Sequence, residues 1–237
     1  MKIKIIGSFK NAHNAKGLVV IIDVLRAFTT ASYVFENKAK KIIVVAEIKE
    51  ARQIKKENPN FILMGERGGK KLSGFEYCNS PLEIQKVNFK NKTIILTTSA
   101  GTQGIIRAVN AKEIIAGAFV NAQAIIDYIK IIKPKIVSLV CTDNRWPDNE
   151  DFMLAKYIKG KLTNKEIDFS HIKKHLINHP CAYRFLKKPI APSGPKDFYL
   201  ALDLDRFNFV VKAEKPNAEQ GNIVKKESSI TLKKLIV

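Results

Sequence analysis

Short apolar runs with the character of buried strands alternate along this chain with segments of helical periodicity. Strand patterns cover residues 18–22, 42–45, 61–64, 93–98, 113–117 and 136–141. Helical patterns cover residues 28–35, 47–57, 103–109, 122–130 and 150–161, and a further helix begins at Ser80-Pro81. Such alternation is typical of α/β proteins, in which helices connect the strands of a sheet. It predicts a mostly parallel sheet with helices on both faces.

The last third of the chain has a different pattern. Residues 170–188 have a polar, helix-like sequence, whereas residues 198–204 alternate in the manner of a half-buried strand. Residues 207–212 are the predicted hairpin partner of that strand. No internal repeat or low-complexity linker interrupts the sequence, so residues 1–237 are predicted to form a single domain.

Polar side chains follow four of the predicted strands, directly after each strand ends. Asp23 and Arg26 follow the first strand pattern, and Glu66 and Arg67 lie in the glycine-rich segment 65–71. The other two ends carry hydroxyl groups and carboxylates, namely Thr97, Thr98, Ser99, Thr102, Asp143, Asp148, Glu150 and Asp151. Because ligands bind at the carboxyl ends of strands in an open α/β sheet, we expect these groups to converge. Their chemistry predicts a site for an anion and a divalent cation.

The carboxylates are candidate magnesium ligands. Asp23 can bind Mg²⁺ while the Arg26 guanidinium binds phosphate oxygens, and Glu150-Asp151 offers further carboxylates. Each pair also has a structural interpretation. Asp23 and Arg26 suit a buried ion pair or a helix cap, and Glu150 and Asp151 suit the first turn of a helix. One Mg²⁺ held by one or two carboxylates and by substrate oxygens is the usual arrangement in phosphoryl transfer.

The remaining candidates lie in loops rich in glycine, threonine and asparagine. Glycines in segment 65–71 let the backbone approach a ligand, although a mobile surface loop would have the same composition. The turn 97–102 suits an anion nest or an ordinary strand-to-helix turn. Ser80 is a predicted N-cap whose helix can face an anion, and Asn121 a predicted N-cap of the helix at 122–130. The candidate substrate-binding residues are Asn79, Ser80, Thr97, Thr98, Gly101, Thr102 and Asn121.

The net charge of +19 points to anionic partners. Lysine pairs such as Lys40-Lys41 and Lys187-Lys188 are scattered over the whole length, which indicates a solvated basic surface and not a groove. Aromatic residues are not interleaved with a basic stripe, as they are in proteins that bind single-stranded nucleic acid. The predicted partner is therefore a small anionic phosphorylated substrate and not a nucleic acid.

Other features exclude further classes of protein. The three cysteines Cys78, Cys141 and Cys181 are widely spaced, which fits neither a disulfide framework nor a zinc knuckle. No apolar run reaches membrane-spanning length, and the amino terminus becomes polar too soon for a signal peptide. We therefore expect a cytoplasmic protein without a membrane partner. The sequence leaves the oligomeric state open, a homodimer included.

Taken in order, these motifs resemble those of the 2-phosphosulfolactate phosphatase (ComB) family. The matching motifs are Asp23-Val24-Leu25-Arg26-Ala27, Gly65-Glu66-Arg67-Gly68, Gly74-Phe75, Asn79-Ser80-Pro81, Thr97-Thr98, Gly101-Thr102 and Glu150-Asp151. Their spacing is preserved from about residue 18 to residue 161, and the C-terminal third matches loosely. The resemblance implies a three-layer α/β/α fold. It also implies a Mg²⁺-dependent acid phosphatase that converts 2-phosphosulfolactate to sulfolactate and phosphate, a step of coenzyme M biosynthesis.

Under this resemblance, Asp23 with Glu150 or Asp151 binds Mg²⁺, and Arg26 and Arg67 neutralise the phosphoryl group. The candidate catalytic residues are Asp23, Arg26, Glu66 and Arg67. Whether Asp23 is a metal ligand or a nucleophile stays open.

Two departures from the family pattern put the substrate in question. Segment 142–147 replaces an expected glycine-containing loop, and Cys78 replaces a small residue. The alternatives are a catalytically altered family member that binds a small anionic phosphometabolite and, less favoured, a nucleic-acid-binding protein.

Overall fold

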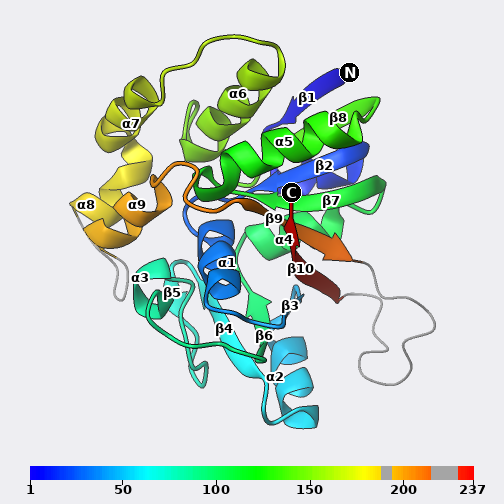
Figure 1. The fold of residues 1–237 in the computed structure, drawn as a ribbon. Coiled ribbons are helices and arrows are strands. Elements are labelled where there is room, and N and C mark those ends of the chain that lie inside the picture. Colours follow the sequence, from blue (N-terminus) through cyan, green and yellow to red (C-terminus); the bar gives the residue numbers. More distant parts are fainter. Residues whose placement is uncertain (188–193, 215–228) are drawn as a thin grey trace.

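The computed structural model describes residues 1–187, 194–214 and 229–237 (Figure 1). Within these residues the strands form a ten-stranded sheet of order β1-β8-β2-β7-β9-β10-β3-β6-β4-β5. The strands are β1 (Lys2–Ile6), β2 (Gly17–Ile22), β3 (Lys41–Val44), β4 (Ile62–Arg67), β5 (Lys70–Lys71), β6 (Thr93–Thr97), β7 (Ala111–Gly117), β8 (Ile136–Cys141), β9 (Phe209–Glu214) and β10 (Ile230–Ile236).

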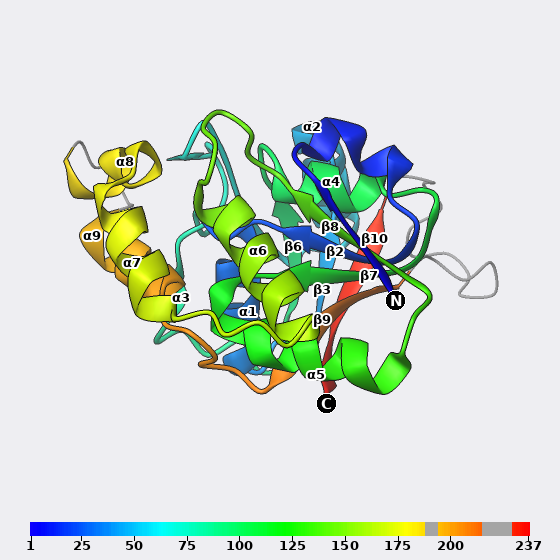
Figure 2. The same ribbon diagram turned by 90° about the horizontal axis from the view of Figure 1, so that it is seen from above.

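Helices cover both faces of the sheet. In Figure 2, α5 and α6 lie on one side of the strands, and α2 and α4 lie on the other. The α-helices are α1 (Ala27–Glu36), α2 (Ile48–Glu57), α3 (Pro81–Ile84), α4 (Gly101–Arg107), α5 (Ala122–Ile132), α6 (Glu150–Leu162), α7 (Phe169–Asn178), α8 (Tyr183–Leu186) and α9 (Pro195–Ala201). Short 3₁₀ helices are η1 (Phe9–Asn14), η2 (Phe119–Asn121) and η3 (Pro180–Ala182). The predicted three-layer α/β/α fold with a mixed central sheet is confirmed.

The sheet consists of two groups of parallel strands joined by an antiparallel pair. Strands β1, β8, β2 and β7 pair in parallel with one another, as do β3, β6 and β4. Between the groups, β9 pairs antiparallel with β7 and β10, and β10 pairs antiparallel with β3. The two groups run in clearly different directions in Figure 1. The loops that follow β2 and β8 therefore approach the loops that follow β4 and β6 from a different direction. They do not lie in a row along one edge of a parallel sheet.

Alternate residues of β2 belong to two different hydrophobic cores. Val19 and Ile21 pack in the core that also contains residues of α1 and α4. Val20 and Ile22 pack in the core that contains residues of α5 and α6. Because successive side chains of a strand point to opposite faces, a fully apolar strand such as β2 requires cover on both sides. This burial fixes the position of Asp23, which follows β2 directly.

The predicted strand at residues 198–204 is wrong. Helix α9 covers most of this segment and begins at Pro195, a residue well suited to the first helical position. Phe198, Ala201 and Leu202 are buried whereas Tyr199 is exposed, which is the i, i+3, i+4 spacing of a helix. The apolar residues therefore fit both periods, and packing against the helical layer decided between them.

Other predictions for the C-terminal third need correction as well. The helix predicted at 170–188 is divided into α7, η3 and α8, with the break at Pro180, and residue 188 lies outside the described residues. The strand predicted at 207–212 exists as β9, but its partners are β7 and β10. Strands β1, β5 and β10 were not predicted. No helix in the described ranges has the length and apolar character needed to cross a bilayer.

Candidate functional site

A cavity of about 280 Å³ lies among the loops that follow β2, β4, β6 and β8. It therefore draws on loops from both groups of strands. Six of the site residues predicted from the sequence line this cavity: Asp23, Arg26, Glu66, Asn79, Glu150 and Asp151. Each of these six side chains is at most 7% exposed. Burial of so many ionisable groups in one place demands compensating partners, and those partners determine what each group can do.

Asp23 follows the end of β2 directly, and helix α1 holds its side chain in place. Its Oδ1 atom accepts a hydrogen bond from the Ala27 backbone N–H at 2.9 Å, at the start of α1. Burial raises the pKa of Asp23 to about 6, and the nearby charge of Glu66 acts in the same direction. A Cβ added to Gly101 would lie 2.7 Å from Asp23 Oδ2, so the start of α4 closely approaches this carboxylate.

Arg26 lies in a buried ion pair. Its Nη1 atom donates to Asp197 Oδ2 at 2.7 Å, and both side chains are almost fully buried. Its Nη2 atom donates to the Gly69 carbonyl at 3.2 Å. The structural alternative of an Asp–Arg pair thus holds for Arg26, although the partner is Asp197 and not Asp23. Much of its positive charge is already compensated before any ligand binds.

Glu66 connects two loops of the cavity. Its carboxylate accepts hydrogen bonds from the Gly69 N–H at 2.7 Å, the Ser99 N–H at 2.7 Å and the Ser99 hydroxyl at 3.0 Å. Gly68 and Gly69 form the two-residue turn between β4 and β5, with φ angles of +60° and +83°. Positive φ at both central residues is typical of the turns that close tight hairpins, which explains the paired glycines. The segment predicted as a loop is therefore a hairpin.

Arg67 does not line the cavity. Its guanidinium donates to the Glu66 carbonyl at 2.7 Å, to the Ala46 carbonyl at 2.9 Å and to Thr97 Oγ1 at 2.9 Å. These bonds hold the end of β4 to the loops beside it. The hydroxyl of Thr97 is used in the same cluster, since it also donates to the Ala46 carbonyl. The structure thus gives Arg67 and Thr97 partners within the protein, and neither residue is among those that line the cavity.

Asp151 and Glu150 differ although they are adjacent at the start of α6. Asp151 accepts four hydrogen bonds, from the N–H groups of Val24, Thr142 and Asp143 and from the Thr142 hydroxyl, at 2.9 to 3.1 Å. Both of its oxygens are therefore occupied in joining the loops after β2 and β8. Burial and the neighbouring charge of Glu150 nevertheless raise its pKa.

Glu150 keeps one carboxylate oxygen without a partner. Its side chain is buried, and Oε2 has no hydrogen bond within the described residues. Burial raises the pKa of Glu150 to about 7. A buried carboxylate oxygen without a partner is costly and suggests a ligand that is not part of the chain.

The other predicted substrate-binding residues fall into two groups. Asn79 lines the cavity, and its Oδ1 atom is buried without a partner in the described residues. Ser80 caps α3 and donates to Asp197 Oδ1 at 2.8 Å. The hydroxyls of Thr98 and Thr102 exchange hydrogen bonds with each other and with the backbone of the turn that they form.

Asn121 lies elsewhere. It is fully buried, and its amide binds the Ala118 N–H at 3.0 Å and the Ala116 carbonyl at 3.4 Å. It is not among the residues that line the cavity, and its side chain does not cap α5. The amide stabilises the turn after β7.

The sequence analysis missed Arg184, a cation of the cavity wall. This residue lies on α8, far along the chain from Asp23, and its Nη2 atom donates to the Leu25 carbonyl at 2.7 Å. No ion pair of Arg184 with a carboxylate is found in the described ranges, in contrast to Arg26. Its charge acts on Asp23 and Glu150, in each case lowering a pKa that burial raises. No local sequence signal distinguishes Arg184 from other basic residues of the chain.

Asp143 and Arg145 form a second charged pair at the cavity rim. The Arg145 guanidinium binds both carboxylate oxygens of Asp143. Burial by itself would raise the pKa of Asp143, but these hydrogen bonds outweigh it and hold the pKa below its usual value. Asp143 was noted in the sequence as part of an acidic stretch, whereas Arg145 was not assigned a role.

The donor set fits a cation that takes few protein ligands. Among the described residues, no group of three or more His, Cys, Asp and Glu side chains is arranged to hold a metal ion. Mg²⁺ does not require such a cage, since it commonly binds one or two carboxylates together with water and phosphate oxygens. Glu150 Oε2 and Asp23 Oδ2, which have no protein hydrogen bond in the described ranges, are the carboxylate oxygens available for it.

The chain is similar to a family of phosphatases. A family model described as 2-phosphosulpholactate phosphatase matches residues 6–190. A "Probable 2-phosphosulfolactate phosphatase" of Carboxydothermus hydrogenoformans is 41% identical over 172 residues, which are 72% of this chain and 71% of the relative. Proteins with the same name from Clostridium tetani (34% over 175 residues, 72% and 75%) and Thermotoga maritima (41% over 150 residues, 62% and 63%) also match. The chain belongs to the 2-phosphosulfolactate phosphatase family.

Proposed function

We propose that the protein is a phosphoric monoester hydrolase that converts 2-phosphosulfolactate, or a related small phosphorylated hydroxy acid, to the hydroxy acid and phosphate. The observation that carries this proposal is the buried Glu150 carboxylate, in a chain of this family: Glu150 lines the same cavity as Asp23 and keeps one oxygen without a hydrogen bond in the described residues. The named relatives act on this substrate according to their names. In that role the enzyme would serve coenzyme M synthesis.

Asp23 and Glu150 would hold Mg²⁺. Each has one carboxylate oxygen without a hydrogen bond in the described residues, whereas both oxygens of Asp151 are occupied. Asp151 is thus a positioning residue, because it fixes the loops that carry Asp23 and Thr142. When bound, the ion would neutralise charge on the phosphoryl oxygens and favour ionisation of a water molecule.

Arg184 is the guanidinium most suited to the phosphoryl group. It lies on the cavity wall without a salt bridge in the described ranges, whereas Arg26 is paired with Asp197. Arg26 would orient the hairpin turn through its bond to the Gly69 carbonyl, and Glu66 would do so from the other side. Fixed charges of this kind stabilise the transition state because they need no reorganisation during the reaction.

Hydrolysis requires one bond to form and one to break. The oxygen of a water molecule bonds to phosphorus, and the bond between phosphorus and the ester oxygen breaks. The proton lost by water is balanced by the one that the departing alkoxide gains.

The experiment measures phosphate release from a panel of small phosphomonoesters that includes 2-phosphosulfolactate and 2-phospholactate. We expect release with Mg²⁺, loss of release with excess EDTA and recovery when Mg²⁺ is restored. Thermal stabilisation by these compounds without any release would instead favour the alternative of a binding protein that has lost catalysis. Release that is unaffected by EDTA would refute the role of the cation.

A further inference from the structure

A second, larger cavity opens beside the first. Its volume is about 660 Å³, against about 280 Å³ for the cavity that contains Asp23 and Glu150. Gly68, Arg145 and Arg184 line both cavities, so the two spaces meet at these three residues. The second cavity is therefore a continuation of the catalytic one.

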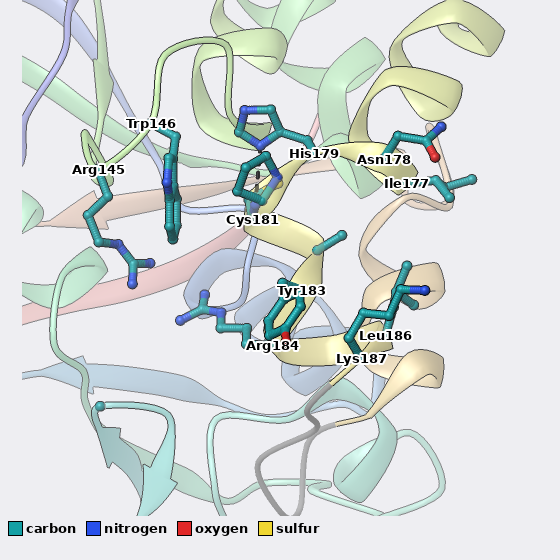
Figure 3. Close-up of a pocket in the computed structure, with 13 residues that line it drawn as sticks. Arg145, Trp146, Ile177, Asn178, His179, Cys181, Tyr183, Arg184, Leu186 and Lys187 are labelled. Atoms are coloured by element: carbon teal, nitrogen blue, oxygen red, sulfur yellow. Dashed lines mark hydrogen bonds between the residues drawn. The ribbon is translucent and has the colours of Figure 1, made fainter.

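The walls of the second cavity are largely apolar. Trp146 and Arg145 lie on one side, and the segment 177–187 of α7, η3 and α8 lies on the other (Figure 3). Apolar surface comes from residues such as Trp146, Pro180 and Leu186. An apolar cavity with a few cations at its edge suits a ligand whose main body is hydrophobic.

Trp146 is held in place from several directions. The Arg145 guanidinium lies over its ring at 4.9 Å from the centroid. Next to it, the Pro147 carbonyl is hydrogen-bonded to His179 Nε2 at 3.0 Å, and the Asp148 carbonyl to His175 Nε2 at 2.9 Å. The loop after β8 is thus fastened to α7 and η3. A preformed aromatic wall binds a planar group at a lower entropic cost than a mobile one.

The size of the combined cavity exceeds what the family substrate needs. 2-Phosphosulfolactate has a three-carbon chain with three anionic groups, which suits the smaller, polar cavity. Pockets of about 300–1,000 Å³ accommodate drug-sized ligands, and the second cavity lies within this range. The loop that carries Trp146 is also the segment in which the sequence departs from the expected glycine-containing pattern.

We propose that this site also hydrolyses larger phosphomonoesters, whose alcohol part carries a planar apolar group that lies in the second cavity against Trp146. The inference rests on the proposed phosphatase function. The phosphoryl group occupies the cavity of Asp23 and Glu150, and the planar group passes Arg184 and Arg145 into the larger space. The bond changes are those of the small substrate: water bonds to phosphorus, and the aromatic alcohol leaves with a proton.

The test compares 1-naphthyl phosphate with 2-phosphosulfolactate. The Trp146→Ala change should lower kcat/KM for 1-naphthyl phosphate about tenfold, mainly through KM, because it removes a stacking partner and buried apolar area. Activity toward 2-phosphosulfolactate should stay within about twofold, since Trp146 does not line the smaller cavity. Tyr199→Ala is the matched control, because this exposed aromatic residue lies outside both cavities and should leave both substrates unaffected.

The outcomes separate the inference from the function on which it rests. If 2-phosphosulfolactate is hydrolysed but 1-naphthyl phosphate is neither hydrolysed nor inhibitory, the inference is overturned and the proposed function stands. Equal activity of wild type and Trp146→Ala on 1-naphthyl phosphate also overturns it. If no phosphomonoester is hydrolysed, the proposed function itself fails.

Discussion

At the scale of single residues, the cavity is defined by how each carboxylate is satisfied. The carboxylate oxygens of Asp151 and Glu66 accept hydrogen bonds from backbone N–H groups and hydroxyls of neighbouring loops. In the described part of the chain, Asp23 and Glu150 each keep one carboxylate oxygen without a hydrogen bond, and burial raises the pKa of both. These four carboxylates are buried to a similar extent, but they have two different roles. The first pair builds the cavity, and the second pair is available to a ligand.

Replacing Glu150 by Gln should stabilise the protein at pH 8 when no metal is present. The same change should abolish phosphatase activity measured with Mg²⁺. Burial raises the pKa of Glu150 from 4.5 to about 7, so the folded state binds its proton more tightly than the unfolded state does. The resulting stabilisation of wild type is complete below pH 4.5 and is lost as the pH rises through about 7. The gain in Tm of Glu150→Gln should therefore be largest at pH 8 and disappear near pH 4.5.

Thermal unfolding in EDTA at several pH values measures this effect. Glu166→Gln provides the control, because Glu166 is exposed and should show no gain at any pH. A Glu150→Gln protein less stable than wild type at pH 8 would contradict the assignment of a costly, unsatisfied carboxylate.

Asp197 should contribute strongly to stability although it was not singled out in the sequence. It pairs with Arg26 and accepts hydrogen bonds from the Ser80 hydroxyl and the Leu82 N–H. Removal of one partner of a buried ion pair costs about 3–5 kcal/mol, so urea unfolding of Asp197→Ala should show a loss of that order. The exposed pair Asp203–Arg206 is the control, and Asp203→Ala should cost about 0–1 kcal/mol. Similar losses in the two variants would contradict this account.

The sequence predicted the cavity residues only in part, and the reason is physical. A charged or hydroxyl side chain at the end of a strand can face a ligand or satisfy the backbone of its own turn. Arg67 and Asn121 do the latter, through hydrogen bonds to carbonyl groups that sequence spacing cannot reveal. Arg184 does the former but lies on a helix of the loosely matching C-terminal third.

At the scale of elements, the site depends on the close approach of α4 to α1. A Cβ added to Gly101 would lie 2.6 Å from the Ala27 Cβ and 2.7 Å from Asp23 Oδ2. Gly101 was predicted to bind substrate, and the structure shows that packing also requires a glycine at this position. The glycine lets the first turns of two helices meet beside the carboxylate of Asp23.

Gly101→Ala should therefore lower both stability and activity. Overpacking of this kind costs about 1–3 kcal/mol, and displacement of Asp23 should reduce kcat at least about tenfold. Urea unfolding and steady-state kinetics measure the two effects. Gly7→Ala is the control, because a Cβ at Gly7 would meet no atom within 4 Å. A fully active Gly101→Ala enzyme would show that α4 does not constrain Asp23.

The elements that sequence periodicity predicted well are those that form from local patterns. Strands β2, β6 and β8 are short apolar runs rich in β-branched residues and buried on both faces, and their length between polar loops favours a strand over a helix. Helix α9 was mistaken for a strand, because its short apolar pattern fits both periods. Strand β10 pairs with β3 and β9, and the former pairing is too distant in sequence for a local pattern to reveal.

At the scale of the whole molecule, the chain has a net charge of +19, and Arg26, Arg145 and Arg184 line the cavity for which we propose a phosphorylated substrate. Long-range attraction raises the rate at which charged substrates arrive, and salt screens it over about 10 Å at 0.1 M. We expect kcat/KM for 2-phosphosulfolactate to fall severalfold as ionic strength rises. The fall should be smaller for methyl phosphate, which has no carboxylate or sulfonate. Equal salt dependence for the two substrates would show that the overall charge does not guide binding.

The most direct test of the account is the rate of phosphate release from 2-phosphosulfolactate by Asp23→Asn, measured with saturating Mg²⁺ beside the control Asp203→Asn. Asn preserves the size of the side chain but removes the charge that would hold the cation. We predict a fall in kcat of about 100- to 1,000-fold for Asp23→Asn and wild-type activity for the exposed control. Wild-type activity in a folded Asp23→Asn protein would contradict the central claim that this cavity is the site of hydrolysis.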